Sequence, residues 1–331
     1  MFSFELLLDA IVLGLLVGCF YAAVSIGLSV SFGLLDVPHV AHPAFLVLAA
    51  YGTYVLNQLG IDPIIAGLML TPVFFVFGIL AYRLYYETFE RRGSDAGVRG
   101  IAFFFGVAFV IEVVIILIFG VDQRTVQALY IGKSIDIGDM RIPMRLLVAF
   151  VVALTLTGLL TLYLARTFTG RAIRAVAQDE MALRLMGANP VAIKQWAFGI
   201  ATAVLGLAGA LLIIVSPVDP TLDRTYIGRT FCVVVMAGLG SMTGTLIAAI
   251  ILGVAESIVL TLYGASWAPA ISFAMLLAVL AVRPQGLFGD RTQWQVLNAD
   301  RHSGSSRRCS SPQRPPQRSL SRTSIRSLPA T

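Results

Sequence analysis

GRAIRAVAQDEMALRLMGANPVAIKQWAFGIATAVLGLAG, residues 170–209, is the stretch around which this chain is organised. Its first half predicts a polar helix of about four turns. One face of that helix has Arg171, Arg174 and Gln178, and the other has Ala172, Val176, Leu183 and Met186. Gly187, Asn189 and Pro190 then end it, because Gly and Asn accept a left-handed cap and Pro cannot continue the hydrogen-bond ladder. From Trp196 the sequence is apolar again, so one ordered, charged helix separates two apolar segments.

Two interpretations of this polar helix are open. Residues 166–195 are much longer than a plain connection between two spans requires. A basic anchoring loop would explain the arginines. A docking helix for a soluble partner, bound in the helix-in-groove mode, would also explain Leu185, an apolar residue on the polar face.

Composition identifies the class of protein. Of the 331 residues, 57% are hydrophobic and 13% are charged, whereas a soluble globular chain has about a quarter charged residues. A helix needs about 20 apolar residues to cross the hydrocarbon core, and the chain has material for roughly eight such segments. The sequence therefore predicts an all-α polytopic membrane protein with about eight transmembrane helices, a re-entrant half-helix and a short cytoplasmic coupling helix.

The chain divides into a membrane domain at residues 1–290 and a tail at residues 291–331. The tail is rich in Ser, Arg and Pro, shows almost no apolar periodicity and is predicted to be disordered. Its eight arginines and single acid, Asp300, account for the formal net charge of +6. The basic balance therefore says nothing about the membrane domain, and we expect no nucleic-acid partner.

The apolar segments give the expected order of spans. They lie at residues 10–34, 44–56, 64–82, 101–119, 146–165, 196–215, 246–262 and 267–282. The long connection 120–144 contains SIDIGDMRIP, whose alternation is typical of a small hairpin.

Orientation follows from the Lys and Arg residues near the spans. One side holds ten of them: Arg83, Arg91, Arg92, Arg99, Arg166, Arg171, Arg174, Arg184, Lys194 and Arg283. The other side holds six: Arg124, Lys133, Arg141, Arg145, Arg224 and Arg229. This modest excess predicts that the loop at residues 166–195 and the C-terminus are cytoplasmic and that the N-terminus lies outside the cell membrane. Residues 230–282 must then cross an odd number of times. A re-entrant half-helix at 230–239, a turn at GLGSMTG, an outward helix at 246–262 and a final inward helix satisfy this requirement.

Two interruptions of apolar segments are candidate parts of a translocation pathway, because broken helices expose backbone groups to a polar solute. The first is LDVPHVAHP at 35–43, with His39 and His42; the second is GLGSMTG at 238–244. The second supplies Gly238, Gly240, Ser241, Thr243 and Gly244. Packing of small residues between helices is the alternative explanation for these glycines. We expect no metal site, because the two histidines lack a nearby Cys or carboxylate partner.

Glu112 and Glu256 lie inside apolar spans, where an unpaired charge is costly. Each is therefore expected to face the protein interior or a cavity. Glu256 joins the candidate pathway residues. A structural hydrogen-bonding role is the alternative.

Energy for active transport must come from a partner, because the chain lacks a phosphate-binding loop. Gly132-Lys133-Ser134 ends like one, but Gln127 stands where the first glycine is required. We expect no cofactor in this chain, with ATP and Mg bound by partner subunits.

Three stretches carry a resemblance to a known family: GRAIRAVAQDEMALRLMGANP, MAGLGSMTGTLIAAIILGVAES and RPQGLFG. In this order, they resemble the signature stretches of the high-affinity branched-chain amino acid ABC transporter permeases, specifically the LivH-type subunit. The resemblance covers about residues 8–290. It implies the permease of a bacterial importer, paired with a second homologous permease, two ATP-hydrolysing ABC subunits and a periplasmic solute-binding protein.

The resemblance also implies that the loop from Glu180 to Gly187 is the segment that sits on an ATPase subunit. The predicted coupling residues are Arg171, Arg174, Glu180, Leu185 and Gly187. Where family members usually have Asn-Phe-Ala-His-Gly, this chain has His39-Val40-Ala41-His42-Pro43. Permeases for urea or amides therefore remain an alternative. A self-sufficient secondary transporter or channel, which would depend on Glu112 and Glu256, is a further one.

Overall fold

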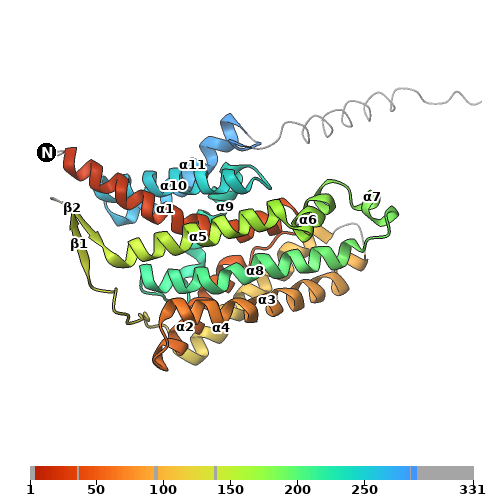
Figure 1. Cartoon of the computed structure of the whole chain (residues 1–331), viewed down its shortest axis with the longest axis horizontal. Coiled ribbons are helices and arrows are strands. Elements are labelled where there is room, and N and C mark those ends of the chain that lie inside the picture. Colours follow the sequence, from red (N-terminus) through yellow and green to blue (C-terminus); the bar gives the residue numbers. More distant parts are fainter. Residues whose placement is uncertain (1–3, 36, 93–95, 138–139, 284, 289–331) are drawn as a thin grey trace, which may run out of the picture. The chain divides into compact units, whose positions relative to one another are not determined.

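The computed structural model describes residues 4–35, 37–92, 96–137, 140–283 and 285–288. The predicted tail at 291–331 lies outside these residues. The helices and strands are α1 (Phe4–Gly33), α2 (His42–Gln58), α3 (Pro63–Thr88), the 3₁₀ turn η1 (Glu90–Arg92), α4 (Ala96–Phe119), β1 (Ser134–Ile137), β2 (Met140–Pro143), α5 (Met144–Arg166), α6 (Phe168–Gln178), α7 (Glu180–Leu185), α8 (Pro190–Val215), α9 (Leu222–Ala237), α10 (Met242–Tyr263), the 3₁₀ turn η2 (Ala265–Trp267) and α11 (Ala268–Val282). Figure 1 shows the long helices running side by side.

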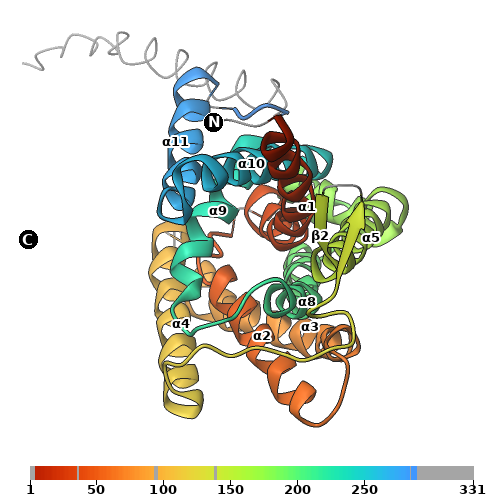
Figure 2. The ribbon, with the colours of Figure 1, turned by 90° about the vertical axis from the view of Figure 1, so that its left-hand side faces the viewer.

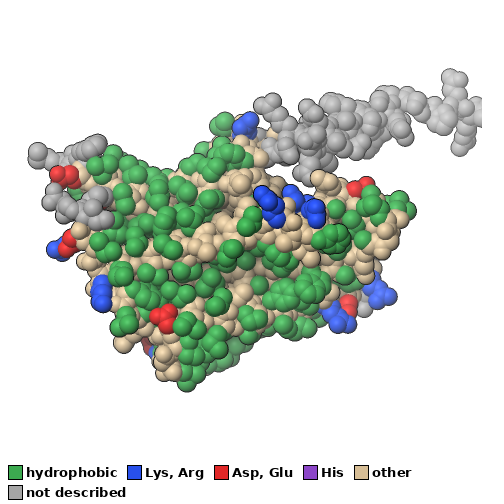
Figure 3. Space-filling model, viewed as in Figure 1, with side chains coloured by type: hydrophobic (Ala, Val, Ile, Leu, Met, Phe, Trp, Pro, Cys, Tyr) green, Lys and Arg blue, Asp and Glu red, His purple; other side chains and the backbone are tan. Residues whose placement is uncertain are grey.

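Six helices of the described residues are long and apolar enough to cross a membrane: α1, α3, α4, α5, α8 and α10. The chain is therefore a multi-pass helical membrane protein. The spans predicted at 44–56 and 267–282 correspond to the shorter helices α2 and α11, so the count of eight stays a prediction. On the face in Figure 3, hydrophobic side chains cover the middle of the helices, and charged ones lie mainly toward their ends.

Helices α1 and α8 form the centre of the bundle. Their most apolar windows are 72% and 83% buried, against 22% for α3, α4 and α5, whose faces are left for lipid or another subunit. Figure 2 shows α1 enclosed by α5, α8, α9 and α10, all of which it contacts. Close approach of α1 to α10 depends on small residues: a Cβ added to Gly18 would lie 2.7 Å from the Ile250 Cα.

The second predicted interruption, which is the turn between α9 and α10, lies against the end of α1 at Gly33, just before the first interruption begins. A Cβ built on Gly240 would lie 3.2 Å from the Gly33 carbonyl oxygen. The φ of Gly240 is +85°, in the left-handed region that side chains disfavour, so this turn requires glycine.

The end of α9 is capped from far along the chain. The last carbonyls of a helix have no partner within the helix. Here Leu287 N donates to the Met236 carbonyl at 2.8 Å, and Phe288 N donates to the Ala237 carbonyl at 3.1 Å. The RPQGLFG stretch thus returns to the second interruption.

Helix α9 corrects the predicted half-helix at 230–239. It begins eight residues earlier, at Leu222, and ends at Ala237. Arg229 therefore lies within a helix rather than in the polar connection before it. The side chain of Arg229 is only 16% exposed, because it is paired with a buried carboxylate.

The connection from α4 to α5 contains the predicted hairpin. Strands β1 and β2 are antiparallel, with Ile135 opposite Ile142. Before the hairpin, Arg124 exchanges two backbone hydrogen bonds with Val218, at 2.8 and 2.9 Å. These bonds hold the α4–β1 connection against the segment that leads into α9.

Candidate coupling segment and translocation site

The predicted coupling helix is two helices, not one. Helix α6 ends at Gln178 and α7 begins at Glu180, with Asp179 extended between them. The Asp179 carboxylate accepts a hydrogen bond from Ala182 N at 2.9 Å, which makes it the N-cap of a new helix. Periodicity continues across this position, so the sequence pattern alone did not separate the two helices.

The polar face is placed as predicted. Arg171, Arg174 and Gln178 are exposed, while Ile173, Val176 and Leu183 are buried against the bundle. The prediction that Met186 lies on the buried face is wrong: its side chain is 74% exposed. Helix α7 ends at Leu185, and Met186 is its C-cap, so the helical spacing no longer determines where its side chain points.

Helix α7 presents an apolar patch to the outside. Leu185, Met181 and Met186 are 82%, 67% and 74% exposed. The predicted exposure of Leu185 is therefore confirmed, and two methionines extend it. Gly187 ends the segment with a φ of +81° and open space around its Cα.

A chain of ion pairs ties α7 to the membrane helices. Glu180 pairs with Lys194 of α8 at 2.8 Å and with Arg184 at 2.7 Å. Lys194 also pairs with Glu90 of η1 at 3.1 Å. The hydrogen bond from Lys194 is the main reason that the pKa of the Glu180 carboxyl is lowered from its ordinary value. Sequence reasoning found Glu180 but missed Lys194 and Glu90, because no local spacing links the three residues.

At the first interruption, both histidines are fully buried. His39 lies in an aromatic cage, with ring centroids 4.6 Å from Phe198 and 5.0 Å from Phe104. The His39 and His42 rings are 5.4 Å apart. His42 Nε2 bonds the Val24 carbonyl of α1 at 2.8 Å. Neither nitrogen of His39 has a hydrogen-bond partner in the described part of the chain.

The second interruption starts α10. Ser241 is the N-cap, and its hydroxyl accepts a hydrogen bond from Gly244 N at 3.1 Å. Gly238 and Gly240 both have positive φ, Gly244 is buried, and Thr243 is exposed. The turn lies against the end of α1, from which the first interruption continues.

Glu256 lies farther along α10 in a closed cluster. Its Oε1 accepts from Arg229 Nη2 at 2.6 Å, and its Oε2 accepts from the Tyr21 hydroxyl at 2.6 Å. The Arg229 guanidinium also stacks over the Tyr226 ring at 5.2 Å. This cluster gives Glu256 a fully bonded environment inside the bundle. Sequence reasoning missed Arg229 because a basic residue next to an apolar run looked like a boundary.

Glu112 faces a cavity, which is one of the two environments that the sequence predicted for it, the other being the protein interior. It is 7% exposed and accepts from Arg224 Nη2 at 2.7 Å. A cavity of about 470 Å³ lies beside this pair, between α4 and α9. Val40 and Pro43, from the first interruption, also line it.

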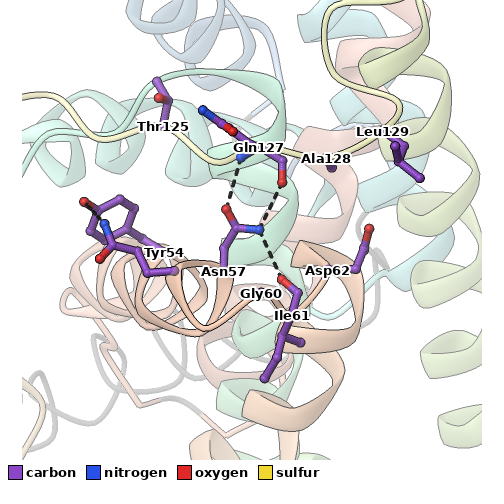
Figure 4. Close-up of a pocket in the computed structure, with 10 residues that line it drawn as sticks. Tyr54, Asn57, Gly60, Ile61, Asp62, Thr125, Gln127, Ala128 and Leu129 are labelled. Atoms are coloured by element: carbon purple, nitrogen blue, oxygen red, sulfur yellow. Dashed lines mark hydrogen bonds between the residues drawn. The ribbon is translucent and has the colours of Figure 1, made fainter.

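A second cavity, of about 430 Å³, lies at the turn between α2 and α3 (Figure 4). Asn57 dominates its polar lining. The Asn57 side-chain nitrogen donates to the carbonyls of Ile61 and Gln127, and its oxygen accepts from Gln127 N at 3.0 Å. Both polar atoms of the Asn57 amide are therefore hydrogen-bonded within the protein, and they hold the α4–β1 connection against the turn between α2 and α3.

The profile of a family described as "Branched-chain amino acid transport system / permease component" matches residues 10–280. The chain belongs to this family. All helices from α2 to α10, with both interruptions and α6–α7, lie inside the matched range.

This chain is similar to several known transport proteins. It is 27% identical over 299 residues to the high-affinity branched-chain amino acid transport system permease protein BraD of Pseudomonas aeruginosa, covering 85% of this chain and 95% of BraD. It is 26% identical over 291 residues to the LivH permease protein of Escherichia coli K12, covering 83% of this chain and 93% of LivH. A shorter match, 30% identical over 166 residues, joins 48% of this chain to 37% of LivM of Salmonella typhimurium. No solved structure matches the chain.

Proposed function

We propose that this chain is the membrane-spanning permease subunit of an ATP-driven importer that moves branched-chain amino acids across the bacterial inner membrane. The family match over residues 10–280 carries this proposal. BraD and LivH, which it resembles over more than nine-tenths of their lengths, are permease proteins of high-affinity branched-chain amino acid transport systems.

The proposed importer is an assembly. A second, homologous permease is supported by the partial similarity to LivM, the other permease named in such systems. Two ABC ATPase subunits would bind ATP and Mg and supply the energy. A periplasmic solute-binding protein would deliver the amino acid. This chain would translocate the solute and catalyse no reaction itself.

The α6–α7 segment is the proposed contact with the ATPase. It combines the exposed arginines of α6, Arg171 and Arg174, with the exposed apolar patch of Met181, Leu185 and Met186. An exposed apolar patch is typical of a protein interface. Glu180 and Lys194 would transmit movement of that contact to α8 through their ion pair at 2.8 Å. The α6–α7 end of the molecule is accordingly proposed to be cytoplasmic, and the N-terminus periplasmic.

The proposed pathway passes the two adjacent interruptions. His39, His42 and the turn at Gly238, Gly240, Ser241, Thr243 and Gly244 would line it, with Glu256 in the closed cluster beyond. Support comes from the buried histidine nitrogens without partners, since such groups are uncommon in a settled core.

Reconstitution tests the proposal directly. The chain would be co-expressed with the neighbouring permease, ATPase and solute-binding genes, and uptake of radiolabelled leucine measured in proteoliposomes containing ATP. We expect uptake that depends on all the subunits, and no ATP hydrolysis by this chain purified alone. Uptake of urea but not leucine would assign the chain to a urea importer. Uptake without ATPase subunits would identify a self-sufficient transporter.

A further inference from the structure

The cavity between α4 and α9 is lined by charged groups whose hydrogen-bonding capacity is only partly satisfied within the protein. Glu112, Asp223 and Arg224 line one part of it. Arg224 has a 67% exposed side chain and reaches Glu112 through a single nitrogen. A guanidinium has five donors, so most of its capacity is directed away from Glu112. The Asp223 carboxylate makes one hydrogen bond in the described residues, to the neighbouring Arg224 N.

The rest of the same cavity is apolar. Phe105 and Phe109 of α4 and Ile227 of α9 form one wall, and Val40 and Pro43 lie next to the first interruption. A volume of about 470 Å³ lies within the range of small-molecule pockets, about 300–1,000 Å³. The cavity therefore combines a cation, two carboxylates and an aromatic–aliphatic surface within reach of one small solute.

The other buried ion pair of the bundle provides a comparison. Arg229 and Glu256 are 16% and 6% exposed, and Tyr21 and Tyr226 cover their remaining sides. That pair is therefore largely enclosed by its neighbours. The Arg224–Glu112 pair borders the cavity, and the Arg224 side chain is 67% exposed. The two pairs have the same chemistry, but Arg224 is much more exposed than Arg229.

We propose that the α4–α9 cavity binds a zwitterionic amino acid with an apolar side chain. Arg224 would bind its carboxylate, because the guanidinium fork matches a carboxylate. Glu112 and Asp223 would bind its ammonium group. Phe105 and Phe109 would contact its side chain. This site rests on the proposed function and deepens it, since it places solute recognition next to Val40 and Pro43 of the first interruption.

The test measures binding separately from uptake. The assembled permease–ATPase complex in lipid nanodiscs, without the solute-binding protein, would be titrated with radiolabelled leucine. Two competitors each lack one charge: leucinamide lacks the carboxylate, and 4-methylpentanoate lacks the ammonium group. Wild type should prefer leucine to both, because a site built around a polar group discriminates against the analogue that lacks it.

Single substitutions should remove these preferences selectively. Arg224→Gln should weaken leucine binding about tenfold or more and abolish the preference over leucinamide. Glu112→Gln should abolish the preference over 4-methylpentanoate. Arg83→Gln, which breaks the exposed Arg83–Glu87 pair on α3, is the matched control and should change neither preference.

The outcomes separate the two proposals. If wild type takes up leucine in proteoliposomes but the Arg224 and Glu112 variants keep both preferences, the cavity is not the recognition site, while the proposed function stands. A purely structural ion pair would lower the amount of assembled complex and leave the selectivity of the remainder unchanged, which also overturns the site. If wild type takes up no branched-chain amino acid at all, the proposed function fails.

Discussion

Replacing Arg229 with Met should destabilise the membrane domain strongly. The substitution keeps a long, flexible side chain of helical propensity similar to Arg but removes the guanidinium. Glu256 would keep the hydrogen bond from Tyr21 and lose both bonds from Arg229, which join Oε1 to Nε at 2.8 Å and to Nη2 at 2.6 Å. The carboxylate is 6% exposed, so water cannot replace those donors without opening the helices.

The magnitude follows from burial. Removing one partner of a buried, hydrogen-bonded ion pair costs about 3–5 kcal/mol, because it leaves an uncompensated charge. The Arg83–Glu87 pair on α3 is the control, since its side chains are 67% and 56% exposed. Breaking an exposed pair of this kind costs about 0–1 kcal/mol. Arg229→Met and Arg83→Met should therefore differ by about 2–5 kcal/mol.

The assay is reversible unfolding in mixed micelles, followed by circular dichroism. The double variant Arg229→Met with Glu256→Leu should recover most of the lost free energy, because the unpaired carboxylate is then absent. Equal unfolding free energies for Arg229→Met and Arg83→Met would refute the reasoning. Failure of the double variant to recover would show that packing against the tyrosines, not charge, holds the cluster.

Four further predictions concern the interruptions, α7 and the tail. Gly240→Leu should abolish uptake while the protein still inserts, because φ is +85° and a Cβ at this position would lie 3.2 Å from the Gly33 carbonyl oxygen. Gly60→Leu is the control, since Gly60 has the same φ in open space. Equal uptake by the two variants would contradict this explanation. Leu185→Asp should cost about 1–3 kcal/mol of ATPase affinity, seen as lost ATPase recovery in a pull-down with membrane insertion unchanged. Truncation after Asp290 should leave insertion and uptake essentially unchanged. At neutral pH the wild-type protein should be more thermally stable than Glu180→Gln, because the folded-state pKa of the Glu180 carboxyl is lowered. The difference should disappear as the pH falls below 4.5, the ordinary pKa of this carboxyl. A difference that survives in acid would show that Lys194 does not stabilise the carboxylate.

Periodicity and composition were sufficient for the elements that depend on local sequence. The long apolar helices, the hairpin in SIDIGDMRIP and the exposure of Leu185 follow from residue spacing alone. Asp179 shows the limit of that approach. One short acidic side chain caps a new helix, which ends only six residues later at Leu185. Met186 lies just beyond that end, and it is exposed rather than buried.

Contacts between distant residues could not be predicted in the same way. Arg229 meets Glu256 across two helices, and Lys194 meets Glu90 across 104 positions of sequence. Each charged residue was visible in the sequence, but nothing local identified its partner. The cavity beside Glu112 was anticipated only as one of two environments for a buried carboxylate. Its apolar wall comes from α4 and its charges mostly from α9, so it exists only once those helices pack.

The cap on α9 has a consequence for the order of synthesis. The amides that satisfy Met236 and Ala237 belong to Leu287 and Phe288, which leave the ribosome only after α10 and α11 have been made. Until then the end of α9 has carbonyl groups without these donors, and unpaired carbonyls are costly away from water. Helices α9, α10 and α11 should therefore settle into the bundle as one late unit, after α1 to α8. A chain released before Phe288 would lack the last step of its own assembly.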